Sequence, residues 1–183
     1  MPRRPVTHPE DAGHAIGMDL ANLPWLRHGM RQSPTLESAA GVCAATLVRE
    51  RFLLCICAAQ FAIRELLPVH MADRVLAGLH AALLQLAQAD EAAGQALQQV
   101  DAAREPYRLA ALDDIDDPLR TQAGIGHIEY AFAMRLIQLG EPSGERCRAC
   151  LLLALDAPRH LWSAVRDAVV FQTLSDAGLL QAH

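Results

Sequence analysis

Lysine is absent from this chain. All 16 basic residues are arginines, in a sequence of 183 residues. This absence excludes chemistry that depends on a lysine amine, namely Schiff-base catalysis, a phosphate-binding P-loop and a Ser–Lys dyad. The sequence also lacks a nucleophile elbow, an HExxH motif and an EF-hand loop, so common enzyme and metal-binding signatures do not assign a function.

Residues that favour β-strands are scarce. Aromatic residues make up 4% of the chain, Val, Ile and Thr together number 21, and Asn22 is the only asparagine, which excludes Asn-Gly hairpin turns. Ala and Leu, which lose little conformational freedom in a helix, together number 61. The composition predicts an all-α protein with an aliphatic core.

The sequence has neither an excess of positive charge nor a long apolar segment. A net charge of −5 with scattered arginines predicts that the protein does not bind nucleic acid. The longest strongly apolar stretch, 52–63, has 12 residues, whereas a bilayer span needs about 20. Polar residues follow Arg3 and Arg4, where a signal peptide has its apolar region. We therefore expect a cytoplasmic protein with no membrane partner and with its five cysteines reduced.

Proline divides the chain into two regions. Residues 1–35 hold five of the ten prolines, and proline at this density prevents long helices. This region is predicted to be an extended Pro-rich arm with one short helix around 18–31, which Trp25 and Leu26 anchor to the core. Residues 36–183 are predicted to form a single bundle domain of six or seven helices.

Capping residues predict three helices in the first half of the bundle. A serine followed by a proline indicates the start of a helix over 34–67, and Pro68 ends it. The next helix covers 69–89. Asp90, directly after this helix, serves as the N-cap of a third helix over 90–104. Pro106 ends that third helix.

Three further helices are predicted in the second half. Gly124 and Gly126 lie inside a helical pattern over 118–139 and indicate a kink, a late helix start near the second glycine, or close packing of another backbone. The other two helices cover 145–155 and 158–177. The charge-free stretch of the first bundle helix predicts the centre of the core, with four fully buried residues: Phe52, Leu53, Ile56 and Ile63.

Cys147 and Cys150 are the first candidates for a functional site. Two thiols three residues apart lie on one helix face, where they can share a metal ion or form a redox pair. His127 and His160 are further candidate ligands. With Glu145 before it, the cysteine pair weakly resembles the signature of alkylhydroperoxidase D and the carboxymuconolactone decarboxylases, which are helical proteins.

That signature places a histidine four residues after the second cysteine, where this chain has Ala154. The proton relay of that family is therefore missing. The competing interpretation makes Cys147 and Cys150 small core residues of a helix that continues with three leucines. Cys55 and Cys57 alternate between helix faces, so at most one of them can join the pair.

The C-terminal segment resembles a second family. Arg159-His160-Leu161-Trp162, followed by Phe171, is similar to the last helices of cytoplasmic redox-enzyme chaperones, which are all-helical and of this size. Their central acidic-Pro-Asp-His signature is absent, and Gly126-His127-Ile128-Glu129 stands in that region. The alternative is that Trp162 and Phe171 pack the terminal helix onto the bundle.

Three hypotheses for the function follow. The first is a non-catalytic cytoplasmic protein without a cofactor that binds a protein partner, as an accessory or maturation subunit, a chaperone or an immunity-type inhibitor, or that forms a homo-oligomer. Its basis is the absence of catalytic motifs and a hydrophobic content of 52%. The second is a thiol- or metal-dependent redox protein that uses Cys147 and Cys150. The third is a small-molecule sensor with an apolar pocket between leucine-rich helices.

Overall fold

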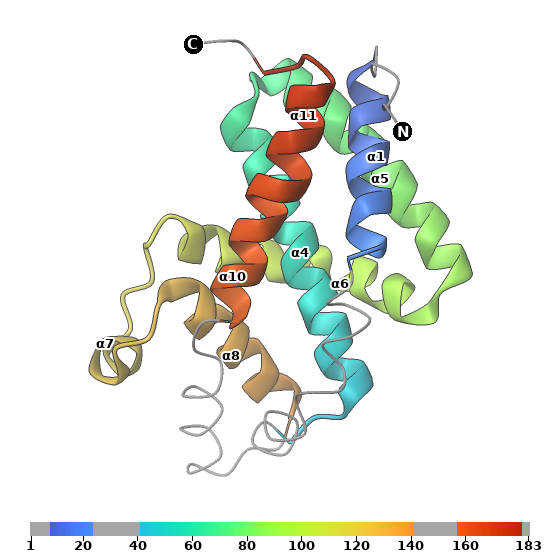
Figure 1. Ribbon diagram of the computed structural model, residues 1–183. Coiled ribbons are helices and arrows are strands. Elements are labelled where there is room, and N and C mark those ends of the chain that lie inside the picture. The colour runs from blue at the N-terminus through green and yellow to red at the C-terminus, as the bar shows by residue number, and fades with distance from the viewer. Residues whose placement is uncertain (1–7, 24–40, 141–156, 181–183) are drawn as a thin grey trace.

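The computed structural model describes residues 8–23, 41–140 and 157–180, and all regular structure within these ranges is helical (Figure 1). The all-α class predicted from composition is confirmed. The predicted helix over 145–155 and the anchor residues Trp25 and Leu26 lie outside the described residues.

Helix α4, Ala44–Leu66, is the central element and contacts helices from both ends of the described chain. Its charge-free stretch is buried as predicted: Phe52 is 7% exposed, and Leu53, Ile56 and Ile63 are 0% exposed. The predicted start of this helix at residue 34 is wrong. Its N-cap is Cys43, whose extended backbone, with φ of −84° and ψ of 163°, excludes a continuous helix from residue 34.

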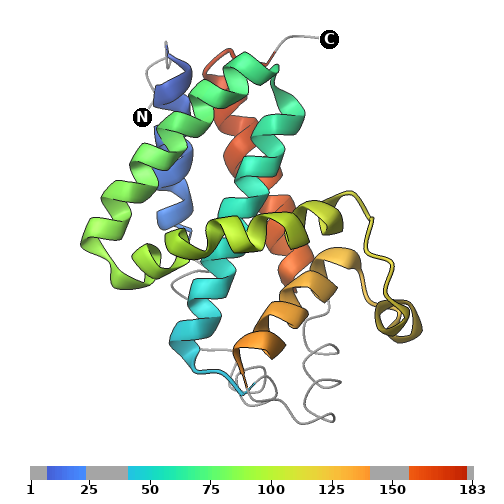
Figure 2. The same cartoon turned by 180° about the vertical axis from the view of Figure 1, so that it is seen from behind.

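Helix α5, Val69–Ala89, has the boundaries that the sequence predicts. It is followed by α6, Glu91–Ala111, which crosses α4 (Figure 2). Asp90 caps α6 as predicted, because its Oδ1 accepts a hydrogen bond of 3.0 Å from the backbone N–H of Ala93. The two helices are thus separated by a single capping residue.

Pro106 lies inside α6, so the prediction that it ends this helix at 104 is wrong. A proline in a helix removes one backbone hydrogen bond and costs about 3 kcal/mol. The turns around it bury Ala103, Tyr107 and Ala110, each at most 1% exposed. Burial of these side chains offsets the cost, and the helix continues to Ala111.

Helix α1, Pro9–Ala21, occupies part of the region that was expected to be an extended arm. The expectation fails for these residues: Ala12, Ile16 and Leu20 are 0% exposed, and α1 packs along α5 (Figures 1 and 2). The proline at its first position sets a helical φ and needs no N–H, which explains how a Pro-rich segment starts a helix here. The short helix thus begins at residue 9, ahead of the predicted 18–31.

Two glycines bring α1 and α5 into backbone contact. A Cβ atom on Gly13 would collide with the carbonyl oxygen of Val75, and one on Gly78 would collide with the carbonyl oxygen of Glu10. Any side chain at either position would push the helices apart. The close approach lets the apolar faces of both helices seal one side of the core.

The predicted helix over 118–139 consists of two helices, α7, Pro118–Ala123, and α8, His127–Leu139. Gly124 ends α7 in the left-handed conformation, with φ of 64°, which glycine adopts without steric cost. Helix α8 begins directly after Gly126. The late helix start is therefore the correct one of the three interpretations.

The last helical run comprises α10, Ala157–Ala164, the π-helical segment η2, Val165–Phe171, and α11, Gln172–Asp176. The prediction of a helix over 158–177 is confirmed to within one residue at each end, although the π-helical segment was not predicted. Trp162 is 8% exposed and packs on the bundle as expected. Phe171 is 48% exposed, so the same expectation is wrong for it. Valines and a leucine fill the buried side of this region in its place: Val169, Val170 and Leu174.

Candidate functional site

A cavity of about 600 Å³ lies between α4, α5, α6 and α10. This volume suits a drug-sized molecule or several side chains of a partner. Each of the four helices contributes to its wall, from Cys57 in α4 to Trp162 in α10. The site therefore exists only because segments distant in the sequence pack together.

Aromatic side chains form much of the apolar wall. Phe61, Tyr107 and Trp162 line the cavity together with Leu76 and Leu112. The ring centroids of Phe61 and Trp162 are 5.9 Å apart, and those of Tyr107 and Trp162 are 6.2 Å apart. These distances are typical of favourable aromatic pairs. The residue that fastens the terminal helix to the bundle is thus also part of the cavity wall.

Exposed polar and charged side chains complete the lining. They are His80 and Glu65 together with three arginines, Arg64, Arg104 and Arg108, and the half-buried Gln60 is the remaining polar amide of the lining. Each arginine pairs with an exposed carboxylate, at 3.7 Å for Arg64–Asp73, 2.9 Å for Arg104–Asp101 and 2.7 Å for Arg108–Glu105. Exposed ion pairs contribute little to stability, so these guanidinium groups can exchange their partners for a bound group.

Burial controls the protonation of two groups in the wall. Desolvation raises the pKa of the Cys57 thiol to about 12 and holds the pKa of the Tyr107 phenol well above its ordinary value. Both groups are therefore neutral at neutral pH. A neutral thiol is a poor nucleophile and a poor metal ligand, so neither of these two groups is activated for covalent chemistry.

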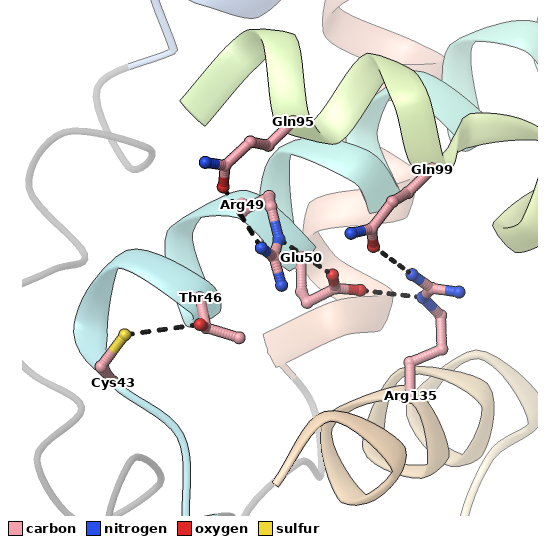
Figure 3. Close-up of polar contacts among 7 residues, drawn as sticks. All are labelled: Cys43, Thr46, Arg49, Glu50, Gln95, Gln99 and Arg135. Carbon is pink, nitrogen blue, oxygen red and sulfur yellow. Dashed lines mark hydrogen bonds and ion pairs between the residues drawn. The ribbon is translucent and has the colours of Figure 1, made fainter. Parts of the chain in front are cut away.

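A buried ion cluster joins α4, α6 and α8 (Figure 3). Glu50 is 0% exposed, and its Oε2 accepts a hydrogen bond of 2.8 Å from Nε of Arg135. Nε of Arg49 lies 3.5 Å from the other carboxylate oxygen. Two glutamines of α6 accept the remaining hydrogen bonds, Gln99 from Arg135 at 3.3 Å and Gln95 from Arg49 at 3.3 Å.

Three buried polar atoms in this region have no hydrogen-bond partner among the described residues: Arg49 Nε, Glu50 Oε1 and Tyr107 Oη. Buried atoms of this kind are rare in folded proteins. Tyr107 belongs to the cavity wall, and the charges of Glu50 and Arg135 act on its phenol.

His127, a candidate metal ligand, has a structural role. Its Nδ1 accepts a hydrogen bond of 3.2 Å from the backbone N–H of Ile115, and its Nε2 lies 3.8 Å from Oδ1 of Asp113. The hydrogen bond engages the lone pair of Nδ1, so the ring holds the backbone of Ile115 in this structure, and a role of His127 as a metal ligand stays a prediction. Glu129, two residues later, is 3% exposed and pairs with Arg159 of α10 at 3.2 Å. This part of α8 therefore fixes a loop and the terminal helix.

The other candidate residues are separated from the cavity or fall outside the described residues. His160 is exposed on α10 and does not line the cavity. Cys147 and Cys150 lie outside the described residues. Within residues 8–23, 41–140 and 157–180, no group of three or more His, Cys, Asp and Glu side chains is placed to hold a metal ion. The cysteine-pair hypothesis stays a prediction.

Sequence reasoning missed the cavity arginines and the buried Glu50. The only local signal for Glu50 is its position between Arg49 and Arg51, immediately before the apolar stretch of α4. A lone acidic residue flanked by two arginines is more typical of a solvated helix surface. Its burial depends on Arg135, which the sequence does not link to it.

The comparisons with known proteins do not assign a family. No family model, curated protein or solved structure that was compared with this chain matches it. Among the described residues, no helix combines the length and the apolar character that a bilayer crossing requires.

Proposed function

We propose that this protein is a non-catalytic binding protein that takes up a segment of a partner protein in the cavity between α4, α5, α6 and α10. The observation that carries the proposal is the composition of the cavity lining, which combines Trp162 and Tyr107 with three arginines. Tryptophan, tyrosine and arginine supply most of the binding energy at protein interfaces. Leu112, which is 53% exposed at the cavity, would lose contact with water when the partner binds.

In this proposal the protein acts in the cytoplasm as an accessory or maturation subunit, a chaperone or an immunity-type inhibitor. These roles need a shaped surface and no reacting group. The neutral thiol of Cys57 and the neutral phenol of Tyr107 support such a role, because neither is activated for chemistry.

A site-specific photo-cross-linker tests the proposal in the cells that produce the protein. Benzoylphenylalanine replaces Leu112 in the cavity lining or, as a matched control, Leu139, which is 41% exposed on α8 and does not line the cavity. We expect one defined protein adduct from position 112 and none from position 139. Equal adducts from both positions, or none from either, would overturn the proposal. An adduct with a second copy would identify a homo-oligomer as the partner.

A small-molecule sensor is the second candidate, and the volume of the cavity favours it. About 600 Å³ lies in the range of pockets that hold small ligands. Native mass spectrometry of the protein purified from its host distinguishes the two functions. A stoichiometric added mass that disappears in Leu76→Arg, which places a charge in the cavity wall, would support the sensor.

A further inference from the structure

The cavity lining is positively charged in a chain that is negatively charged overall. Its charged residues are Arg64, Arg104, Arg108 and Glu65, which gives three positive charges against one negative and a formal sum of +2. The whole chain has a net charge of −5. The single carboxylate in the lining is already engaged, because Arg166 donates a hydrogen bond of 3.2 Å to Glu65.

The three arginines keep binding capacity despite their own ion pairs. The partner carboxylates are largely exposed, with side-chain exposures of 61% for Asp73, 89% for Asp101 and 62% for Glu105. Each guanidinium has five N–H donors. Arg104 has a single close contact with Asp101, and its charge also acts on Cys57 in the cavity wall. Arg104 and Cys57, which is 4% exposed, line the same cavity.

Tyr107 forms part of the cavity wall, but its buried hydroxyl is not open to the cavity. Its side chain is 0% exposed, it lines the cavity, and its hydroxyl has no hydrogen-bond partner among the described residues. A buried hydroxyl without a partner costs about 1 to 3 kcal/mol. The charged donors that a ligand can reach are therefore the guanidinium N–H groups of the exposed arginines, and a carboxylate, which only accepts, complements them.

We infer that the partner segment bound by this cavity is acidic and apolar, with a bulky apolar side chain next to one or more carboxylates. The apolar side chain packs against Phe61, Leu76 and Trp162. The carboxylates accept hydrogen bonds from Arg64 and Arg104. This inference rests on the proposed function, since it names the chemistry of the segment that fills the same cavity.

Selection from a library of random dodecapeptides displayed on phage, with the full chain as the target, tests the inference. We expect the selected peptides to combine Leu, Phe or Trp with Asp or Glu. A synthetic copy of a selected peptide should bind about tenfold more weakly to Arg64→Ala and to Arg104→Ala, the effect of losing one charge-assisted hydrogen bond. Its affinity should also fall as sodium chloride is added. Arg74→Gln, which alters an exposed arginine outside the cavity, should bind it like the wild type.

Other results separate the inference from the proposed function. Selected peptides that are apolar but not acidic, and whose binding is lost only in Leu112→Arg, would overturn the inference and leave the proposed function standing. Enrichment of Lys and Arg would also overturn the inference. Binding of every selected peptide that is unchanged in Leu112→Asp, which removes the apolar contact and repels an acidic peptide, would overturn the proposed function itself.

Discussion

The carboxylate of Glu50 and the guanidinium of Arg135 meet at 2.8 Å inside the bundle, although 85 residues separate them in the chain. The side-chain exposure is 0% for Glu50 and 11% for Arg135. The pair ties α4 to α8, and Gln99 of α6 completes the arrangement from a third helix (Figure 3). Its directional hydrogen bonds fix the position of α8 against the central helix more narrowly than aliphatic contacts do.

Removal of one member of this pair should be strongly destabilising. Arg135→Met leaves Glu50 buried without its main partner, and we expect the free energy of unfolding to fall by about 3 to 5 kcal/mol. The double variant Glu50→Gln/Arg135→Met should lose less than the sum of the two single variants, because neither Glu50 nor Arg135 is then left as a charge without the other. Urea denaturation of the four proteins in this cycle provides the measurement. Additive losses would show that the two side chains are not coupled.

The contact between α1 and α5 should tolerate no side chain at its two glycines. Gly13→Ala and Gly78→Ala each place a methyl group against a carbonyl oxygen of the opposite helix. The helices must separate, and we expect a loss of about 1 to 3 kcal/mol in the free energy of unfolding. Gly94→Ala is the matched control, because a Cβ there has its nearest neighbour at 3.4 Å. In α6 this control should be neutral or stabilising by up to about 1 kcal/mol. Equal effects at all three positions would contradict the close approach.

Local signals in the sequence predict most of the helix boundaries, and tertiary packing explains where they fail. Helix α5 begins after Pro68 and ends before Asp90, and both residues act through their own backbone or side chain. Pro106 gives an equally strong local signal, yet α6 continues through it. The difference is Tyr107, whose complete burial stabilises the turn after the proline. The burial of Tyr107 depends on residues that are distant in the sequence, so the local sequence around Pro106 does not reveal it.

The candidate site could not be predicted for the same reason. Its lining combines residues of α4 and α6 with Trp162, and no spacing rule connects residues about 50 to 100 positions apart. The sequence offered instead a short motif, Cys147 and Cys150, because local motifs are what a single sequence makes visible. The predicted packing role of Trp162 is correct, but its place in the cavity wall depends on Phe61 and Tyr107.

The cysteines of the described residues should differ sharply in reactivity. The hydrogen bond from Thr46 lowers the pKa of the exposed Cys43 thiol, whereas burial raises the pKa of the Cys57 thiol to about 12 and that of Cys55 further. Iodoacetamide should therefore label Cys43 in the native protein, with a rate that rises with pH from below the ordinary thiol range. It should leave Cys55 and Cys57 unmodified until denaturant is added.

Peptide-resolved mass spectrometry measures all five thiols in one experiment. Thr46→Val tests whether Thr46 lowers the pKa of the Cys43 thiol, and it should shift the labelling of Cys43 to higher pH. Fast native labelling of Cys57 would contradict its burial. The same data test the thiol hypothesis, because that hypothesis requires rapid labelling of Cys147 near neutral pH, with Cys150 reacting more slowly.

Acid should weaken the two hydrogen bonds that the Asp117 carboxylate accepts at the start of α7. The hydroxyl of Tyr130 donates a hydrogen bond of 2.6 Å to this carboxylate, and the backbone N–H of Leu119 donates another at 2.8 Å. Together they lower the pKa of Asp117 in the folded protein, with Tyr130 as the larger cause. A carboxyl whose pKa is lower when folded stabilises the protein above its unfolded pKa, about 3.9 for aspartate. That contribution is lost as the pH falls through the unfolded value towards the folded one.

Tyr130→Phe isolates this effect, because it keeps the buried ring and removes the hydroxyl. At about pH 6 the urea midpoint of the variant should lie below that of the wild type, because the ionised carboxylate has lost its strongest donor. As the pH is lowered to about 3, the wild type should lose its advantage, since a protonated Asp117 no longer gains from a charge-assisted hydrogen bond. The two midpoints should therefore converge. A difference that stays constant from about pH 6 to about pH 3 would show that the hydroxyl acts through packing alone and not through the charge of Asp117.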